Sequence, residues 1–267
     1  MPTEIDGSVP HSARIWNYWI GGKDNYPIDR EMGDRIAAGY PQIKAQAIAD
    51  RAFIGRAVTY LAREQGIRQF LDIGTGLPTV DNTHEVAQRI APESRIMYVD
   101  NDPLVLAHAR ALLTSAPEGR CEYLDADVRD PDAILAAARG LLDFTEPIAV
   151  MLVGILHHVE DTEESYRLVR RLVDALPEGG HLVINHATYA VFGDASKEAA
   201  QQYNDAGGRP PLTLRAPAEI ARYFDGLEIA EPGLVSCAHW RPDQSDIATW
   251  GQPAEVDEFA AVARKPR

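Results

Sequence analysis

Apolar and polar positions follow two different rhythms along the chain. Between residues 42 and 65, apolar side chains such as Phe53 and Leu61 recur every three to four positions, which predicts a helix with one buried face. Beyond Gly66 the chain changes to short, almost wholly apolar runs, which are typical of strands buried on both faces. The sequence therefore begins with helical segments and continues with alternating strands and helices.

Five apolar runs alternate with helical segments in the second part. They are RQFLDIG, RIMYVD, CEYLDADV, PIAVMLVGIL and HLVINHA. Asn82, Asp102 and Asp130 stand where helix N-caps are expected, the last two directly before proline. This order predicts an α/β fold with a doubly wound, mostly parallel, Rossmann-like sheet. Two later segments, 227–240 and 258–265, are further candidate strands.

The charge balance argues against some partners. With 26 basic and 40 acidic residues among 267, the formal net charge is −14, so a nucleic-acid backbone would be repelled. The N-terminus lacks the features of a secretory signal and no apolar run is long enough to cross a bilayer, so we expect a cytoplasmic protein without membrane contact. Cys121, Cys237 and the histidines show no ligand spacing, and we expect neither a disulfide framework nor a metal site.

A glycine-rich turn follows the first predicted strand, in the stretch FLDIGTGLPTVDN. In a doubly wound sheet this is where a nucleotide-like ligand binds, and Gly74 and Gly76 let the backbone approach it closely. A dinucleotide motif needs a third glycine where this chain has Thr79, and Asp72 would stand beside the pyrophosphate. NAD is therefore a weaker alternative than a ligand that carries an ammonium group and no phosphate.

S-adenosylmethionine (SAM) has such a structure, and acidic residues at three successive strand ends match its parts. Asp72 is placed to bind the amine, directly or through water. Asp100 is placed to accept hydrogen bonds from both ribose hydroxyls, and we include its neighbour Asn101 in the site. Asp127 would accept from the adenine amino group while the backbone N–H of Val128 donates to a ring nitrogen. The alternative is that each aspartate only caps a turn or a helix.

The strings FLDIGTGLPT, YVDND, DADV and VGILHHV resemble the successive motifs of class I SAM-dependent methyltransferases, and the last adds Gly154 to the cofactor-binding residues. ARIWNYWIGGKDNY, MYVDNDP and PAEIARYFDG are similar to one family in particular, formerly a domain of unknown function and now labelled S-adenosyl methyltransferase. The resemblance covers nearly the whole chain. It implies a seven-stranded methyltransferase sheet, SAM as cofactor and methyl transfer to an acceptor that is not established. Pro78 departs from the general class, which favours a glycine there.

The segment RIWNYWIGGKDNY near the N-terminus has helical spacing up to its glycine pair. We expect this helix to pack across the mouth of the cofactor site, with Gly21, Gly22, Lys23 and Asn25 at the methionine end of the ligand. Lys23 would bind the cofactor carboxylate. Tyr18 would face the sulfonium, whose positive charge an aromatic ring attracts.

The N-terminal residues 1–65 are thus interpreted as a helical lid and residues 66–267 as the methyltransferase domain. Trp16 and Trp19 share one helical face, and we expect them to be core or dimer contacts. A homodimer is left open.

Methyl transfer depends mainly on orientation, and a base is needed only when the acceptor must lose a proton. His157 and, second, His186 are the candidates for that base, although a structural role for His157 is an equal alternative. We expect a small-molecule acceptor between the N-terminal segment and residues 189–215, with Tyr203 and Arg209 as contacts. Two other functions stay open: a non-catalytic SAM-binding sensor or partner protein, and an NAD-dependent oxidoreductase.

Overall fold

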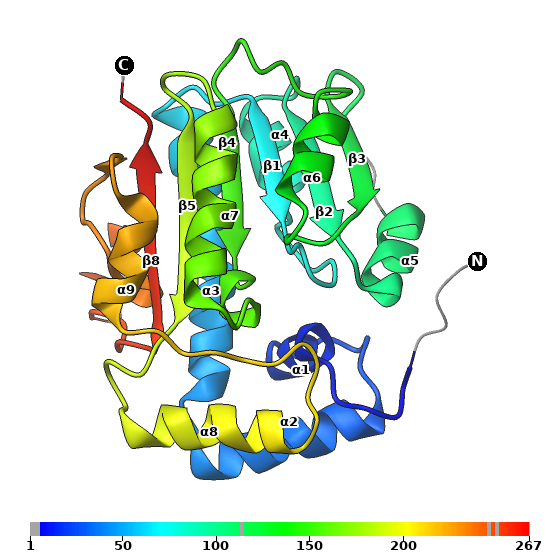
Figure 1. The fold of residues 1–267 in the computed structure, drawn as a ribbon, viewed down its shortest axis with the longest axis vertical. Helices are drawn as coiled ribbons and strands as arrows, with labels where there is room; N and C mark the ends of the chain where they lie inside the picture. The colour runs from blue at the N-terminus through cyan, green and yellow to red at the C-terminus, as the bar shows by residue number, and fades with distance from the viewer. Residues whose placement is uncertain (1–5, 113–114, 245–246, 249–250, 267) are drawn as a thin grey trace.

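The computed structural model describes residues 6–112, 115–244, 247–248 and 251–266. Within these ranges the strands form one sheet, and helices cover both of its faces (Figure 1). The strands are β1 (Gln69–Ile73), β2 (Arg95–Asp100), β3 (Arg120–Asp125), β4 (Ala149–Val153), β5 (His181–Ala187), β6 (Glu228–Ile229), β7 (Val235–Ser236) and β8 (Glu258–Arg264).

The sheet has the order β3-β2-β1-β4-β5-β8-β6, and β7 also pairs with β8. Neighbours among β1 to β5 run parallel, whereas β8 is antiparallel to β5, β6 and β7. The predicted doubly wound, mostly parallel sheet is confirmed. Chain order reverses between β1 and β4, where such sheets open a crevice for a ligand.

The late candidate strands are confirmed only in part. The second of them forms β8, but segment 227–240 forms two strands of two residues each. Pro232 and Gly233 separate them, because proline has no N–H to donate and Gly233 adopts a positive φ of 95°.

The long helix predicted before the first strand is present as α3. The α-helices are α1 (Ser12–Trp19), α2 (Pro27–Gly39), α3 (Ile43–Arg63), α4 (Thr83–Ile90), α5 (Pro103–Leu112), α6 (Pro131–Ala138), α7 (Thr162–Ala175), α8 (Asp194–Asp205) and α9 (Pro217–Ala221); the short 3-10 helices are η1 (Leu156–His158), η2 (Arg222–Phe224) and η3 (Cys237–His239). None of the helices in the described part of the chain has the length and apolar character that crossing a membrane requires.

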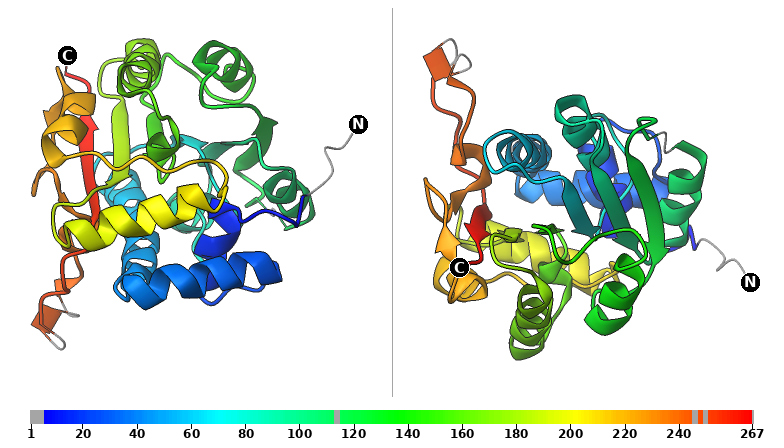
Figure 2. Two further views of the ribbon diagram at one scale, coloured as in Figure 1. Left: turned by 60° about the horizontal axis from the view of Figure 1, so that its bottom comes forward. Right: turned by 90° about the horizontal axis from the view of Figure 1, so that it is seen from above.

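Successive strand residues face opposite sides of the sheet, and each side has its own core. Leu71 packs with residues of α6 and α7 on one side, while Phe70 packs with residues of α3 and α4 on the other. Figure 2 shows these helices on the two sides of the sheet. The helix starts expected at Asn82, Asp102 and Asp130 are confirmed. The carboxylates of Asp102 and Asp130 each accept from a backbone N–H of the first turn, and the backbone N–H of Asn82 donates to Glu85.

A separate layer of helices lies beyond the carboxyl ends of the parallel strands. In Figure 1, α1 lies below the arrowheads of the central strands, and α2 and α8 lie side by side beneath it. The core of this layer contains Ile15, Ile36, Tyr40 and Tyr203. The sequence analysis did not predict α2, which Pro27 begins. This layer closes the crevice of the sheet from outside.

Candidate functional site

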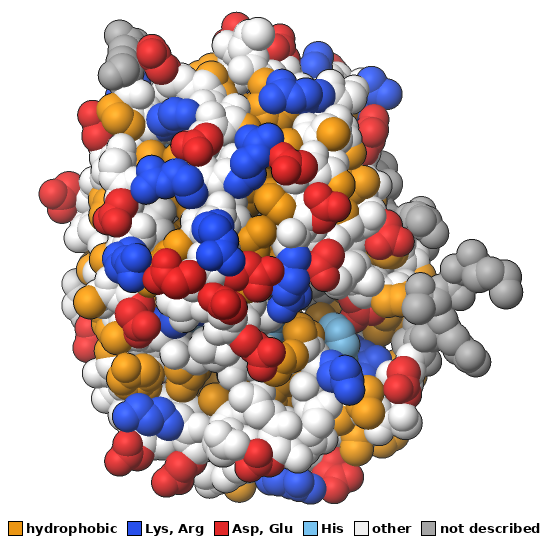
Figure 3. Space-filling view, viewed as in Figure 1, with side chains coloured by type: hydrophobic (Ala, Val, Ile, Leu, Met, Phe, Trp, Pro, Cys, Tyr) orange, Lys and Arg blue, Asp and Glu red, His pale blue; other side chains and the backbone are white. Residues whose placement is uncertain are grey.

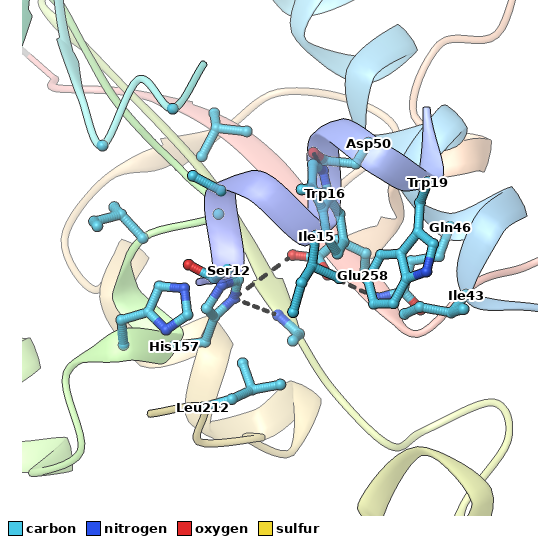
Figure 4. A pocket seen from close by; sticks show the side chains of 18 of the residues that line it. Ser12, Ile15, Trp16, Trp19, Ile43, Gln46, Asp50, His157, Leu212 and Glu258 are labelled. Atoms are coloured by element: carbon cyan, nitrogen blue, oxygen red, sulfur yellow. Dashed lines mark hydrogen bonds and ion pairs between the residues drawn. The ribbon is translucent and has the colours of Figure 1, made fainter. Parts of the chain in front are cut away.

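A cavity of about 230 Å³ lies where strand ends of the sheet face the outer helical layer (Figure 4). We call its two parts the strand-end half and the helix half. The strand-end half is lined by Arg51, Gly74, Thr75, Gly76, Leu77, Asp100, Asn101, Gly154 and Ile155. The helix half is lined by Ile15, Trp16, Trp19, Ile36, Ile43, Ala199, Tyr203 and Leu212, together with the polar residues Gln46, His157 and Glu258.

The predicted glycine turn lies in the strand-end half. Gly74 and Gly76 both have positive φ angles, of 80° and 65°. A Cβ atom on Gly74 would lie 2.6 Å from the Cβ atom of Ile155, whereas one on Gly76 would meet nothing within 4 Å. Gly74 is therefore required for close packing against the loop after β4, and Gly76 leaves the cavity open.

Asp100 at the end of β2 borders the cavity and holds the glycine turn. One of its oxygens accepts from the backbone N–H of Gly76 at 2.9 Å, and the other accepts from that of Asp102 at 2.9 Å. Burial raises the pKa of Asp100 to about 6. A half-buried carboxyl in a cleft, with one side open to the cavity, is well placed to accept hydrogen bonds from a ligand.

The predicted adenine contacts lie next to the cavity lining. Asp127 and Val128 are not among the lining residues, but the side-chain amide of Asn101 contacts the Asp127 carboxylate at 3.3 Å. Asp127 also accepts from the backbone N–H of Arg129 at 2.8 Å. The cavity surface thus ends at Asn101, one hydrogen bond away from Asp127.

Asp72 is buried behind the glycine turn and does not line the cavity. Its carboxylate accepts from the hydroxyl of Thr83 at 2.6 Å, which ties the end of β1 to the start of α4. Burial raises its pKa to about 6.

The predicted clamp of the N-terminal segment is not at the cavity surface. Lys23 is exposed, and the Tyr18 hydroxyl donates to Asp34 at 2.8 Å on the outer side of α1. The chain turns away after α1 because Gly21 adopts a φ of 82°. The clamp residues that lie outside the lining are Tyr18, Gly21, Gly22, Lys23 and Asn25.

These residues instead hold Asn17, which is buried and lines the cavity. The side-chain oxygen Oδ1 of Asn17 accepts from the side-chain amide of Asn25 at 3.0 Å and from the backbone N–H of Asp24 at 3.0 Å. A Cβ atom on Gly22 would lie 2.3 Å from the Asn17 amide nitrogen. The glycine pair and the asparagine therefore fix a neighbouring side chain in the wall.

The sequence analysis did not identify Arg51, the positively charged side chain in the cavity wall. Arg51 on α3 is the one lysine or arginine among the described residues that line the cavity. Its guanidinium donates to the carbonyl of Val80 at 2.9 Å and to Asn82 at 3.3 Å, which ties α3 to the loop after the glycine turn.

Trp16 and Trp19, which we expected to be core or dimer contacts, both line the helix half (Figure 4). Their rings meet edge to face, with centroids 5.5 Å apart. Both also pack against the core of the outer helical layer, as expected, whereas their place in the cavity wall was not predicted. Of the two acceptor contacts expected, Tyr203 lines the cavity and Arg209 does not.

Asp50 joins the two halves of the cavity. Its carboxylate accepts from the indole N–H of Trp16 at 3.2 Å and from the side chain of Asn185, whose oxygen accepts from the backbone N–H of Gly154 at 2.5 Å. Burial raises the pKa of Asp50 to about 7.

Glu258 is a second carboxyl in the wall, with 1% of its surface exposed (Figure 4). One oxygen accepts from Gln46 at 3.0 Å, and Gln46 in turn accepts from the Tyr40 hydroxyl at 2.9 Å. The other oxygen lies 3.9 Å from Nδ1 of His157. Burial and, secondarily, the neighbouring Asp50 raise the pKa of Glu258 well above its ordinary value.

The two histidine candidates differ in their access to the cavity. His157 lines it, and burial holds its pKa well below the ordinary value. His186 is fully buried behind the wall, with Nδ1 at 2.7 Å from the carbonyl of Ala187 and Nε2 at 2.7 Å from Arg215. Arg215 also donates to two backbone carbonyls that flank the His157 turn. The geometry favours His157 as the histidine that meets a ligand.

A family model described as S-adenosyl methyltransferase matches residues 1–266. The chain belongs to the S-adenosyl methyltransferase family. The resemblance seen in the sequence is confirmed, and SAM is the cofactor of this methyltransferase. The NAD-dependent alternative has no support from the family match.

Solved structures agree with this assignment. A DUF574 family protein from Streptomyces avermitilis MA-4680 is 44% identical with a TM-score of 0.92, and the match covers 98% of this chain and 100% of that one. A protein from Thermobifida fusca YX proposed to be a methyltransferase is 39% identical with a TM-score of 0.87, covering 98% and 97%. An O-methyltransferase family protein from Burkholderia thailandensis, 15% identical over 86% of this chain and 62% of that one with a TM-score of 0.51, shares the fold. Among curated proteins no match is found.

The residues of the strand-end half of this S-adenosyl methyltransferase fit the cofactor. The turn that only glycine can form at Gly74 leaves backbone within reach of a ligand, and Asp100 offers a half-buried acceptor for hydroxyl groups. Arg51 is a guanidinium in the wall that matches a carboxylate.

Proposed function

We propose that this methyltransferase transfers the methyl group of SAM to a small molecule that is enclosed in the helix half of the cavity. The observation that carries the proposal is the continuity of one cavity from the glycine turn to the apolar helical layer. A cofactor in the strand-end half and an acceptor in the helix half would share one space without crossing bulk water.

In the strand-end half, Gly74, Gly76, Asp100, Asn101 and Gly154 are the proposed cofactor-binding residues. All five line the cavity, which supports their assignment. Asp100 would bind the ribose hydroxyls through the oxygens that also hold the glycine turn. Asp127 and Val128 remain the proposed adenine contacts, reached beyond Asn101.

The methionine end requires a partner for its carboxylate, and Arg51 supports that role better than Lys23. Arg51 lines the cavity, whereas Lys23 is exposed outside it. Gly22 and Asn25 would act through Asn17, which they hold in the wall. Asp72 would act through the position of the turn and of α4 rather than by direct contact.

Bound SAM supplies a methyl group that is attached to a positively charged sulfur. A nucleophile with a free electron pair can accept this methyl group. The residues of the chain would orient the acceptor and exclude water. His157 lines the wall, which supports it as a group that positions the acceptor, but the burial that lowers its pKa makes it a weak base. His186 would support this turn from behind, since Arg215 contacts both.

A small acceptor is favoured by the shape and charge of the molecule. The helix half is mostly apolar and is bordered by α1, α2 and α8, so it suits a small ligand better than a chain lying on an open surface. On the face drawn in Figure 3, acidic and basic side chains are interspersed, without the continuous basic patch that nucleic acid requires.

Calorimetry with SAM, followed by a turnover assay, tests the proposal. We expect SAM to bind, and S-adenosylhomocysteine (SAH) to form when the low-molecular-mass fraction of a cell extract is added. Product formation only with the macromolecular fraction would contradict the small-molecule acceptor. Tight binding of SAM without turnover in either fraction would favour a non-catalytic sensor.

The cytoplasmic location, the homodimer and the division into a lid (1–65) and a methyltransferase domain (66–267) stay predictions from the sequence. The position of α1, α2 and α3 around the cavity supports the lid.

A further inference from the structure

A buried carboxyl and a buried histidine face each other in the cavity wall. An oxygen of Glu258 lies 3.9 Å from Nδ1 of His157, and both side chains are more than nine-tenths buried. Nδ1 accepts from the backbone N–H of Ala187 at 3.4 Å, which uses its one free electron pair. Glu258 is therefore the member of this pair that can bind a polar group of a ligand.

Glu258 and Asp50, two buried carboxyls of this wall, define the kind of group that would bind here. Taking a carboxylate out of water is costly, and more so beside a second carboxylate. An amine offsets this cost, because it takes the proton of a neutral carboxyl or, as an ammonium group, pairs with a charged one. A neutral hydroxyl group does neither.

The rest of the wall around this pair is also matched to a cation with an apolar body. Asp50 is a second buried carboxyl that interacts with Glu258, while the one guanidinium among the described lining residues, Arg51, belongs to the strand-end half. Beside the pair, the labelled apolar side chains Ile15, Trp19, Ile43 and Leu212 border the space in Figure 4.

We propose that Glu258, beside His157, binds the amino group of the methyl acceptor, and that the acceptor is an apolar amine. This inference rests on the proposed function, because it assigns the helix half to the acceptor. Gln46 acts as a positioning residue, since it holds the other oxygen of Glu258 and is itself held by Tyr40.

Glu258 also accounts for the proton that an amine must lose. An ammonium group has no free electron pair, so it must first give one proton to the Glu258 carboxylate, which leaves a neutral amine and a neutral carboxylic acid. Burial raises the pKa of Glu258 toward that of an amine, which lowers the free-energy cost of this transfer. His157 stays neutral beside it, because burial holds its pKa well below the ordinary value.

Binding of matched ligands to the SAH-loaded protein tests the inference without using turnover. The probes are 2-phenylethylamine, 2-phenylethanol and 3-phenylpropanoate, which share an apolar ring and differ in their polar end. We expect the amine to bind at least about tenfold more tightly than the alcohol, since it can form a charge-assisted hydrogen bond with Glu258, and the carboxylate to bind least. Glu258→Gln should remove the preference for the amine and leave binding of SAH unchanged.

Glu198→Gln on α8 is the matched control, because Glu198 is exposed and the substitution removes the same charge. It should keep the amine preference of the parent. Equal affinity of the parent for amine and alcohol, or an unchanged preference in Glu258→Gln, would overturn the inference even if SAH binds. If Glu258→Gln does not fold, the ligand series on the parent protein decides alone. A parent protein that binds no SAH would overturn the proposed function itself.

Discussion

The two halves of the cavity are built in opposite ways. In the strand-end half, Asp100 ends β2 and the glycines follow β1 directly, so the parallel sheet brings them together as soon as it forms. In the helix half, Gln46 meets Glu258 across 212 positions of sequence. The first half is encoded by local motifs, whereas the second exists only after α3 and β8 have packed. Substitutions in the two halves should therefore separate cofactor binding from acceptor binding.

Gly74→Ala should have the largest effect on the strand-end half. The new Cβ atom would lie 2.6 Å from Ile155, and alanine is strained at a φ of 80°. We expect SAM affinity by calorimetry to fall by about a hundredfold or more, on the order of 3 kcal/mol. Gly55→Ala within α3 is the control, because a Cβ atom there meets nothing within 4 Å. Parent-like SAM affinity in Gly74→Ala would mean that the ligand does not depend on this turn.

Asp100→Asn should weaken binding next most strongly. The variant keeps the shape of the side chain but loses the charge and one acceptor oxygen, and hydrogen bonds to a charged group contribute about 1.5–3 kcal/mol, or ten- to a hundredfold. Asp125→Asn is a close control, since Asp125 pairs with Asp100 in register at the end of β3 and is exposed. SAM and adenosine should lose affinity equally, because both carry the ribose. A loss confined to SAM would move Asp100 to the methionine end.

The sequence predicted the sheet and most of the strand-end half because these follow from short-range patterns. Strand ends after apolar runs and glycines at a turn are visible without any knowledge of packing. Lys23 and Asn25 were predicted to touch the cofactor, but they lie outside the cavity lining. The direction of the chain after α1 depends on Gly21 and on α2, which was not predicted.

The helix half escaped sequence reasoning for a physical reason. Gln46 and Asp50 occupy the same stripe of α3 as the buried Phe53 and Ala57, and polar residues in an apolar stripe were the available signal. The partners of these two residues come from β8, β5 and α1, and no local pattern relates Glu258 to His157. Such a site is specified by tertiary contacts alone.

Arg51→Met sharpens the comparison with a smaller effect. If Arg51 binds the cofactor carboxylate, SAM affinity should fall by about tenfold, as expected for one charge-assisted contact. Binding of 5′-methylthioadenosine, which lacks the amino-acid end, should stay within twofold of the parent. Arg63→Met, near the end of the same helix and exposed, controls for loss of a positive charge. An equal loss for both ligands would show that Arg51 acts only through its bonds to the loop after the glycine turn.

Asp72→Asn should change binding least and stability most visibly, because Asp72 lies behind the wall. Burial raises its folded-state pKa from an ordinary value of 3.8 to about 6. The ionised carboxyl therefore destabilises the fold increasingly as pH rises through that interval, whereas below it the carboxyl is protonated in both states. Asparagine keeps an acceptor for Thr83 and removes this cost.

Melting temperatures of the ligand-free proteins should agree at pH 4. At pH 7.5 the variant should melt a few degrees higher, because a shift of about two pKa units corresponds to at most roughly 3 kcal/mol. SAM affinity at pH 7.5 should fall by no more than a few-fold. A loss as large as that of Asp100→Asn would instead assign Asp72 to direct contact with the cofactor amine.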